Sequence, residues 1–292
     1  MIAATQQATS LMPRCVADYL AAAAGGALLA ELETWPKPGL VSHLDSGSHI
    51  DMDASTFKAS TIAIAPFFGD LAVAAAAGSD IDRLREIGVE AERAMLAATG
   101  GVNTHRGAIF GLGLLCAAAG AGWSGSSARA RWHWSAKVLA ATVTQRWGNA
   151  ILRGPIPLHS HGTNALRQFG AGGARAQAAA GFPIALNLGV PALRLGRCLA
   201  PEDPEAARVQ SFFAILASME DTNLLHRGGA AGLRYAQEEA AGFLRLGGVE
   251  RADWRGRAAA VHRAFVARHL SPGGCADLLA ITLFLDALES PS

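Results

Sequence analysis

The sequence is poor in the residue types that favour β-sheets and in net charge of either sign. Only 7% of its 292 residues are aromatic, and 25 basic residues against 24 acidic ones leave a formal net charge of +1. Such a balance creates no global field that would attract nucleic acid or an anionic membrane, so we expect neither as a partner. Any polyanionic ligand must therefore be bound by a local group of residues.

Two further absences limit the class of protein. The four cysteines, Cys15, Cys116, Cys198 and Cys275, stand far apart with no CxxC pair, so we expect reduced thiols rather than disulfides or a zinc site. Residues 1–10 lack the basic and apolar regions of a secretory signal, which predicts a cytoplasmic protein.

The composition that remains favours helices. Hydrophobic residues make up 51% of the chain, alanine and leucine dominate, and no convincing run of alternating strand residues competes. The uncharged stretch 107–128 is about as long as a membrane span, but its glycines favour a buried helix instead. With no repeat and no flexible linker, we expect one all-α domain over residues 1–292, with roughly nine or more helices joined by Gly/Pro-rich loops. Helical periodicity places these helices at about 14–34, 55–77, 80–98, 104–120, 127–147, 205–225, 230–245, 252–269 and 274–289.

The segment from Glu31 to Asp53 concentrates charged side chains in one loop. Prolines on both sides of Lys37 stiffen the backbone, so that its ammonium group could be aimed at a phosphate. Asp51 and Asp53 could offer hard oxygen ligands to Mg²⁺, but either could equally be the N-cap of the following helix. His49, taken alone, is more typical of a structural histidine.

A second polar cluster, at residues 100–107, precedes the long apolar helix. Asn103 or Thr104 could cap this helix, where free backbone amides and the positive end of the helix dipole favour an anion. Simple capping would not account for the adjoining His105 and Arg106. We therefore expect a phosphate-binding site here.

Three other clusters carry weaker signals. Arg175 ends a glycine-rich turn that could approach a phosphate, or could simply connect two helices. The segment 220–229 holds an Asp-Thr-Asn run that is costly inside a helix, which indicates either a functional role or hydrogen bonds to buried groups. Asp277 lies in the first turn of the last helix, where the helix dipole alone could account for it.

Taken together, these segments resemble the triphosphoribosyl-dephospho-coenzyme A synthase family, which serves malonate decarboxylase and citrate lyase. His226 before Arg227 is more similar to the malonate decarboxylase branch. The motifs occur in family order along nearly the whole chain: PKPGLV (36–41), SGSHIDM (46–52), GVNTHRGAIFGLGLL (101–115), GARAQAAAGFP (173–183), DTN (221–223), RGG (227–229) and SPGGCADLLA (271–280).

The resemblance implies an all-helical enzyme that transfers the triphosphoribosyl group of ATP to the 2′-hydroxyl of 3′-dephospho-coenzyme A and releases adenine. Such glycosyl transfer needs a base, an acid for the departing purine, and negative charge near C1′. We expect catalytic groups among His49, His105, Asp277 and Glu31; substrate contacts from Lys37, Asn103, Thr104, Arg106, Arg175, Asn223 and Arg227; and Mg²⁺ ligands from Asp51, Asp53 and Asp221.

Two other functions fit the same residues. A helical Mg²⁺-dependent N-glycosyl hydrolase would use the same carboxylates with water as the acceptor, and a non-catalytic nucleotide-binding protein would turn nothing over. The density of acid, base and amide groups argues against the second. The expected partners are the two small-molecule substrates, and a homodimer is one candidate for the assembly.

Overall fold

The computed structural model describes residues 12–123, 132, 134–155 and 167–289. Within these ranges the chain is built from helices and connecting loops, and no strand occurs. The elements are α1 (Arg14–Leu32), α2 (Ala54–Ala76), α3 (Ile81–Ala98), α4 (Arg106–Ala121), α5 (Ala136–Arg153), α7 (Gly173–Ala179), the π-helix η1 (Ala185–Gly189), α8 (Val190–Leu199), α9 (Pro204–Leu216), α10 (Thr222–Arg245), the short 3₁₀ helix η2 (Gly248–Glu250), α11 (Trp254–Ala267) and α12 (Gly273–Glu289).

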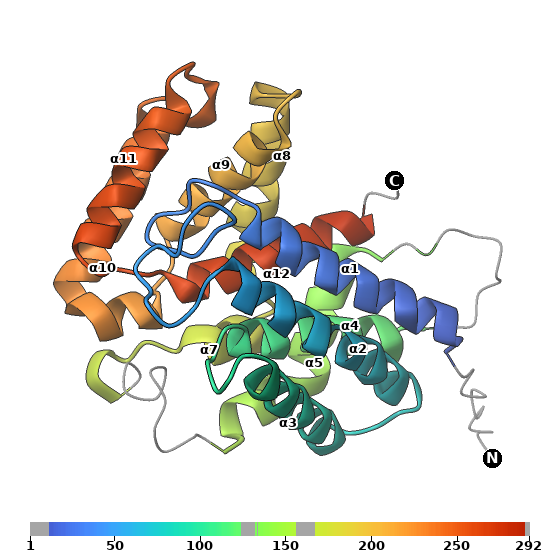
Figure 1. The fold of residues 1–292 in the computed structure, drawn as a ribbon. Coiled ribbons are helices and arrows are strands. Elements are labelled where there is room, and N and C mark those ends of the chain that lie inside the picture. The colour runs from blue at the N-terminus through green and yellow to red at the C-terminus, as the bar shows by residue number, and fades with distance from the viewer. Residues whose placement is uncertain (1–11, 124–131, 133, 156–166, 290–292) are drawn as a thin grey trace, which may run out of the picture.

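The apolar helix α4 lies at the centre of the molecule, between α2, α5 and α12 (Figure 1). Almost all of its residues are buried, and small side chains let neighbouring helices approach closely. A Cβ on Gly120 would stand only 2.0 Å from the carbonyl oxygen of Ala72 in α2. Close backbone contact at this crossing therefore requires glycine, which explains how an alanine-rich sequence forms a dense core.

The second half of the chain forms a separate group of helices beside this centre. Figure 1 shows α8 and α9 running together, and α10 and α11 standing at the outer side. The loop between α1 and α2, residues 33–53, lies against this group, because Gly39 packs on the backbone of Leu270 and Arg227 of α10 donates to the carbonyl of Ser48. Residues from both halves thus meet around one long loop.

The predicted all-α class is confirmed for the described residues, and most helix positions agree within a few residues. Two details were wrong. No helix was predicted in residues 170–200, where α7, η1 and α8 form. The predicted helix 205–225 is interrupted, since α9 ends at Leu216 and α10 begins at Thr222. The predicted helix 127–147 begins among residues outside the described ranges, and α5 accounts for the remainder.

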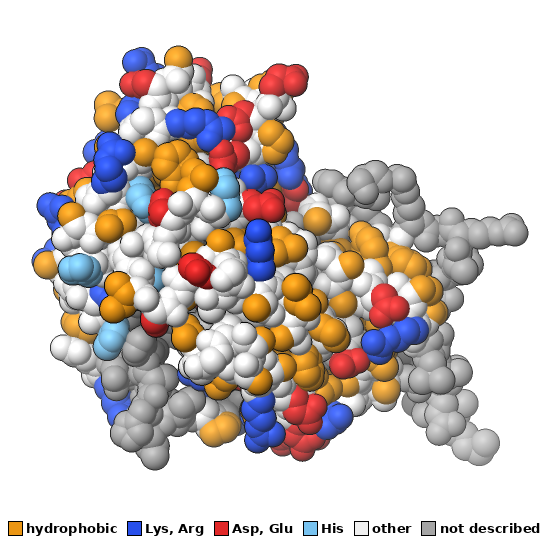
Figure 2. All heavy atoms as spheres, in the orientation of Figure 1, with side chains coloured by type: hydrophobic (Ala, Val, Ile, Leu, Met, Phe, Trp, Pro, Cys, Tyr) orange, Lys and Arg blue, Asp and Glu red, His pale blue; other side chains and the backbone are white. Residues whose placement is uncertain are grey.

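Two helices, α1 and α2, are long and apolar enough to cross a membrane by length and composition. Half of each apolar window is buried inside the protein, as in the core helices of many soluble proteins, so this is weak evidence for a membrane span. The stretch singled out in the sequence instead forms α4, which is shorter and buried. Figure 2 shows hydrophobic side chains on the outward side of α1 and α2, Leu29 and Ile62 among the exposed ones.

Candidate active site

The segment 270–277, at the start of α12, contacts the other predicted clusters. Its Ser271 hydroxyl lies 2.8 Å from Nε2 of His49, and the backbone amide of Cys275 donates to Asp221 at 2.8 Å. Asp277 lies against Gly107, where a Cβ would meet its Oδ2 at 2.0 Å. Loops that are far apart in the sequence therefore converge on one helix start.

Asp221 joins two helices at this point. Its Oδ1 accepts hydrogen bonds from the amides of Asn223 and Leu224 in the first turn of α10, while Oδ2 accepts from Cys275 in the first turn of α12. The carboxylate is fully buried, and desolvation raises its pKa although these three amides act in the opposite direction. A cap of this kind explains why the Asp-Thr-Asn run begins a new helix, α10, rather than lying inside α9.

Lys37 and Glu31 form a buried ion pair in the same region. Their side chains are 0% and 5% exposed, and Nζ of Lys37 donates to Oε1 of Glu31. Burial lowers the pKa of Lys37 and raises that of Glu31, while the attraction between the two opposes both shifts. The pair therefore places a cation and a carboxylate together in a water-poor environment.

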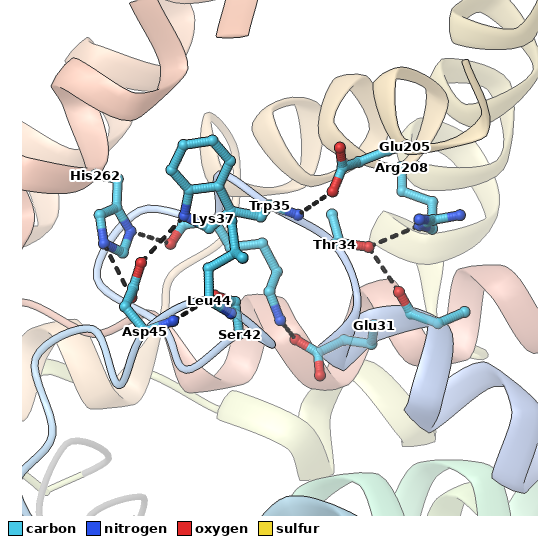
Figure 3. A network of polar contacts seen from close by, with 11 residues as sticks. Glu31, Thr34, Trp35, Lys37, Ser42, Leu44, Asp45, Glu205, Arg208 and His262 are labelled. Carbon is cyan, nitrogen blue, oxygen red and sulfur yellow. Dashed lines mark hydrogen bonds and ion pairs between the residues drawn. The ribbon is translucent and has the colours of Figure 1, made fainter. Parts of the chain in front are cut away.

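The loop around Lys37 is fixed by a network that reaches α11 (Figure 3). Nδ1 of His262 lies 2.8 Å from the carbonyl oxygen of Lys37, and its Nε2 lies 3.2 Å from Oδ1 of Asp45. The other oxygen of Asp45 accepts from Nε1 of Trp35 at 3.1 Å. His262, which is buried, thus holds the two ends of the Lys37 loop together.

Asp277 occupies the start of α12 with its carboxyl group beside α4. Desolvation raises its pKa well above the ordinary value, and the nearby carboxylates of Glu31 and Asp221 raise it further. The backbone amide of Ala108 donates to the carboxyl group and opposes the shift. Because the raising causes dominate, Asp277 is a half-buried carboxylic acid suited to giving a proton.

His49 and Arg227 lie together on the other side of Ser271. Nη2 of Arg227 is 3.4 Å from Nδ1 of His49, whose same nitrogen lies 3.7 Å from Oδ1 of Asp51. Desolvation and the charge of Arg227 lower the pKa of His49, which favours the neutral imidazole. A neutral histidine next to an arginine can accept a proton close to a bound anion.

The predicted anion pocket at the start of α4 is formed only in part. Oδ1 of Asn103 accepts from the amide of Arg106 at 3.2 Å, as expected of a residue that closes the first turn. The side chain of Arg106 is half exposed and pairs with Glu92 of α3 at 2.9 Å. Thr104 and His105 turn inward to Ser60 of α2. The four residues therefore face two different environments.

The predicted magnesium ligands do not meet as a group. Asp53 is the N-cap of α2, and its Oδ1 accepts from Thr56 and Ser55, which lowers its pKa to about 2. Asp51 is exposed beside His49, and both oxygens of Asp221 bind backbone amides. Within the described ranges no three His, Cys, Asp or Glu side chains are arranged to hold a metal ion.

Arg175 has a role that the sequence did not predict. Its guanidinium donates to the carbonyl oxygens of Pro155, Ile151, Leu152 and Gly154 at the end of α5, with Nη1 2.7 Å from the first of these. These carbonyls lack partners within the helix, so Arg175 closes the end of α5.

We expect Arg175→Met to lower the melting temperature without changing the KM for ATP. Loss of charge-assisted hydrogen bonds of about 1.5–3 kcal/mol would remove the closure of α5. Arg106→Met is the matched control, since its partner Glu92 is a surface residue and we expect little change in stability. Thermal melts and ATP saturation curves of both variants measure these effects. A raised KM with an unchanged melting temperature in Arg175→Met would support the phosphate role that the sequence predicted for Arg175.

Two residues of the site gave no signal in the sequence. Ser60 lies inside the apolar helix α2, and His262 lies inside α11 between Val261 and Arg263. Neither belongs to a Gly/Pro-rich break, and each contacts its partner across a long sequence separation. The one signal that could have drawn attention to them is a polar residue at a position expected on the buried face of its helix.

Comparison with known proteins identifies the class. The model of the family described as ATP:dephospho-CoA triphosphoribosyl transferase matches residues 17–292. Two relatives are named "Probable 2-(5''-triphosphoribosyl)-3'-dephosphocoenzyme-A synthase". The one from Azotobacter vinelandii is 41% identical over 279 residues, which cover 94% of this chain and 92% of the relative. The one from Pseudomonas putida is 38% identical over 283 residues, which cover 94% of this chain and 96% of the relative. No solved structure matches the chain.

These matches define a transferase of the triphosphoribosyl-dephospho-CoA synthase type. The chain belongs to the ATP:dephospho-CoA triphosphoribosyl transferase family, which confirms the resemblance found in its motifs. The match extends over the segments that converge on α12, so the candidate site lies within the region that the family shares.

Proposed function

We propose that the protein transfers the 5-triphosphoribosyl group of ATP to the 2′-hydroxyl of 3′-dephospho-coenzyme A and releases adenine. Family membership supports the reaction. The observation that carries the site assignment is the convergence of the Lys37 loop, the start of α4 and the start of α10 on segment 270–277. That convergence gathers acids, a cation and histidines around one point.

The reaction breaks the bond from C1′ of ribose to adenine and forms a bond from C1′ to the acceptor oxygen. The electron pair of the broken bond stays with the purine, which takes up a proton, and the acceptor hydroxyl loses one. An oxocarbenium-like state lies between, so the site must provide an acid, a base and negative charge near C1′.

Asp277 is our candidate for the acid. Its raised pKa favours the protonated carboxyl group, and glycine at position 107 leaves no side chain between this group and the start of α4. Glu31 supplies negative charge near the developing cation, with Lys37 fixing its orientation. The paired charges keep the position of Glu31 constant when water is excluded.

His49 is our candidate for the base, because its pKa is lowered and its ring lies next to Arg227. Arg227, Asn223 and the exposed Arg106 are our candidates for phosphate contacts, with Asn103 fixing the first turn of α4 beside Arg106. Mg²⁺ would be held mainly by the triphosphate oxygens, with exposed Asp51 as a protein ligand. The magnesium requirement remains a prediction.

The product of this reaction would be a prosthetic-group precursor for an acyl carrier protein. We favour malonate decarboxylase over citrate lyase on the residue His226 before Arg227. We also propose a cytoplasmic enzyme whose partners are small molecules, because both substrates are nucleotides of the cell interior.

The acceptor tests the reaction. Purified protein with ATP, Mg²⁺ and dephospho-coenzyme A should release adenine and yield one coupled product of the summed mass, whereas coenzyme A should fail because its 3′-phosphate crowds the attacking hydroxyl. Chromatography of adenine and mass spectrometry of the product measure both. Release of adenine without a coupled product would indicate the hydrolase. Tight binding of ATP without turnover would indicate a binding protein. Equal rates with dephospho-coenzyme A and coenzyme A would contradict the proposed geometry.

A further inference from the structure

The imidazole of His105 has one nitrogen that is left without a partner inside the protein. His105 is 3% exposed, and among buried side-chain polar atoms of the described residues only its Nε2 and Nε1 of Trp123 lack a hydrogen bond. Buried polar groups are nearly always paired, because an unpaired one costs the full loss of its hydration. This unpaired nitrogen belongs to a residue two positions before Gly107, against which Asp277 lies, so it is a candidate atom for binding a ligand.

The other ring nitrogen of His105 is held by two hydroxyl groups. Oγ of Ser60 lies 2.7 Å from Nδ1, and Oγ1 of Thr104 donates to Oγ of Ser60 at 2.8 Å. With the Ser60 oxygen accepting from Thr104, its own proton is free to point at Nδ1. Nδ1 then accepts, and the single proton of a neutral imidazole lies on Nε2.

The ring stays neutral under ordinary conditions. Desolvation, with a smaller contribution from the charge of Lys37, lowers the pKa of His105 to about 3. The backbone amide of His105 is fixed on Sδ of Met95 at 3.2 Å, and the half-buried ring of Phe57 packs edge-on at 4.9 Å between centroids. A ring so held presents a fixed N–H donor, and it is too weak a base to remove a proton from a hydroxyl.

We propose that Nε2–H of His105 donates a hydrogen bond to a ring nitrogen of the adenine of bound ATP, and that Ser60 and Thr104 are positioning residues that fix the tautomer required. This inference rests on the proposed transfer from ATP. It replaces the prediction that His105 is a base, and it assigns to Ser60 a role in the reaction.

The charges nearby favour adenine over the triphosphate as the group next to His105. The ammonium of Lys37 is already neutralised by Glu31, and Asp277 interacts electrostatically with the further carboxylate of Asp221. The cation that acts on His105, Lys37, is thus already paired and does little to attract a triphosphate, whereas a neutral purine offers acceptor nitrogens to an N–H donor. Two donors are available to such a purine. The N–H of His105 lies at the start of α4, and the protonated carboxyl group of Asp277 lies at the start of α12, which packs against α4 there.

The chemistry also favours this assignment. As the bond to C1′ breaks, its electron pair moves onto the purine, and a fixed donor aimed at a ring nitrogen stabilises that charge more than it stabilises bound ATP. Asp277 then delivers the proton that the purine retains. His105 keeps its own proton throughout, so its contribution does not depend on pH in the neutral range.

The test compares His105→Gln, which keeps an N–H donor at about the same reach, with His105→Leu, which keeps none. We expect His105→Leu to lower kcat by about 10²–10³-fold and His105→Gln to recover most of this loss. Calorimetry with adenine as the ligand, without dephospho-coenzyme A, should show about 3–10-fold weaker binding to His105→Leu. Ser60→Ala should give an intermediate loss, and Thr61→Ala, which removes a hydroxyl bound to the carbonyl of Phe57 instead, should give none.

Purine analogues locate the contact. One of 1-deaza-ATP, 3-deaza-ATP and 7-deaza-ATP, each lacking one ring acceptor, should react slowly with the wild-type protein and lose nothing further in His105→Leu. Equal losses in His105→Gln and His105→Leu, or full additivity for all three analogues, would overturn the proposal. If the wild-type protein formed no coupled product, the proposed function would fail, while the adenine calorimetry would still decide the contact.

Discussion

Asp277→Asn should lower kcat by about 10²–10⁴-fold and leave the protein at least as stable as before. The loss follows from removing the proton that the departing adenine needs, a contribution typical of general acids. Asparagine has nearly the shape of a protonated carboxyl group, so it can occupy the space against Gly107. A gain in stability together with a loss of activity is typical of a functional residue whose side chain is unfavourable for folding but needed for the reaction.

The pH dependence has a definite sign. The pKa of Asp277 is raised in the folded protein, so this residue favours folding below its unfolded pKa, and that contribution is lost as pH rises through the folded pKa. The stability of Asp277→Asn relative to wild type should therefore increase with pH. Wild-type turnover should fall only as pH rises through the folded pKa, because the acid of the folded protein becomes ionised there. Urea unfolding and kcat measured across pH test both statements.

Asp286→Asn is the matched control, since it makes the same substitution in the same helix. Asp286 is buried and paired with Arg194 at 3.2 Å and Arg197 at 2.6 Å, far from the start of α12. It should lose stability and keep kcat, the opposite pattern. If Asp277→Asn kept wild-type kcat, Asp277 would not be the acid, and if it were as unstable as Asp286→Asn, its carboxyl would be ionised and paired in the native state.

The sequence predicted most helices because the apolar periodicity is strong and the breaks contain glycine and proline. It failed where those same residues lie inside helical structure. Residues 170–200 contain Gly181, Pro183 and Pro191, yet Pro191 lies in the first turn of α8, where it costs no hydrogen bond. No local pattern in the sequence marks the π-helix η1. Its Gly189 packs closely against Thr282 of α12, and a contact between segments so far apart in the sequence leaves no local signal.

Several of the predicted polar clusters lie together at the start of α12, but the contacts of individual side chains did not follow from the sequence. The sequence allowed Asp53 to be either a cap or a metal ligand, and it is a cap. It placed Arg175 with the phosphates, although its donors close α5. Which donor meets which acceptor depends on contacts between distant segments, and those contacts are set by the packing of the helices rather than by local pattern.

The effect expected of Lys37→Met is large for both stability and activity. Removing the ammonium leaves Glu31 buried, 5% exposed and without its partner, which typically costs about 3–5 kcal/mol. For a chain of this size that loss corresponds to a melting temperature lower by on the order of 10 °C. We expect turnover to fall by roughly 10–100-fold as well, because Glu31 would become protonated and no longer stabilise positive charge at C1′.

The double variant Lys37→Met with Glu31→Gln separates the structural part of this loss from the chemical part. With both charges gone, no uncompensated charge is buried, so most of the lost stability should return and the two single effects should be far from additive. Activity should stay low, because the carboxylate is absent. Urea unfolding and adenine release by the two single variants and the double variant measure both quantities. Additive losses of stability would mean that the two side chains are not a coupled pair, and recovery of activity with stability in the double variant would mean that Glu31 and Lys37 serve only to hold the loop in place.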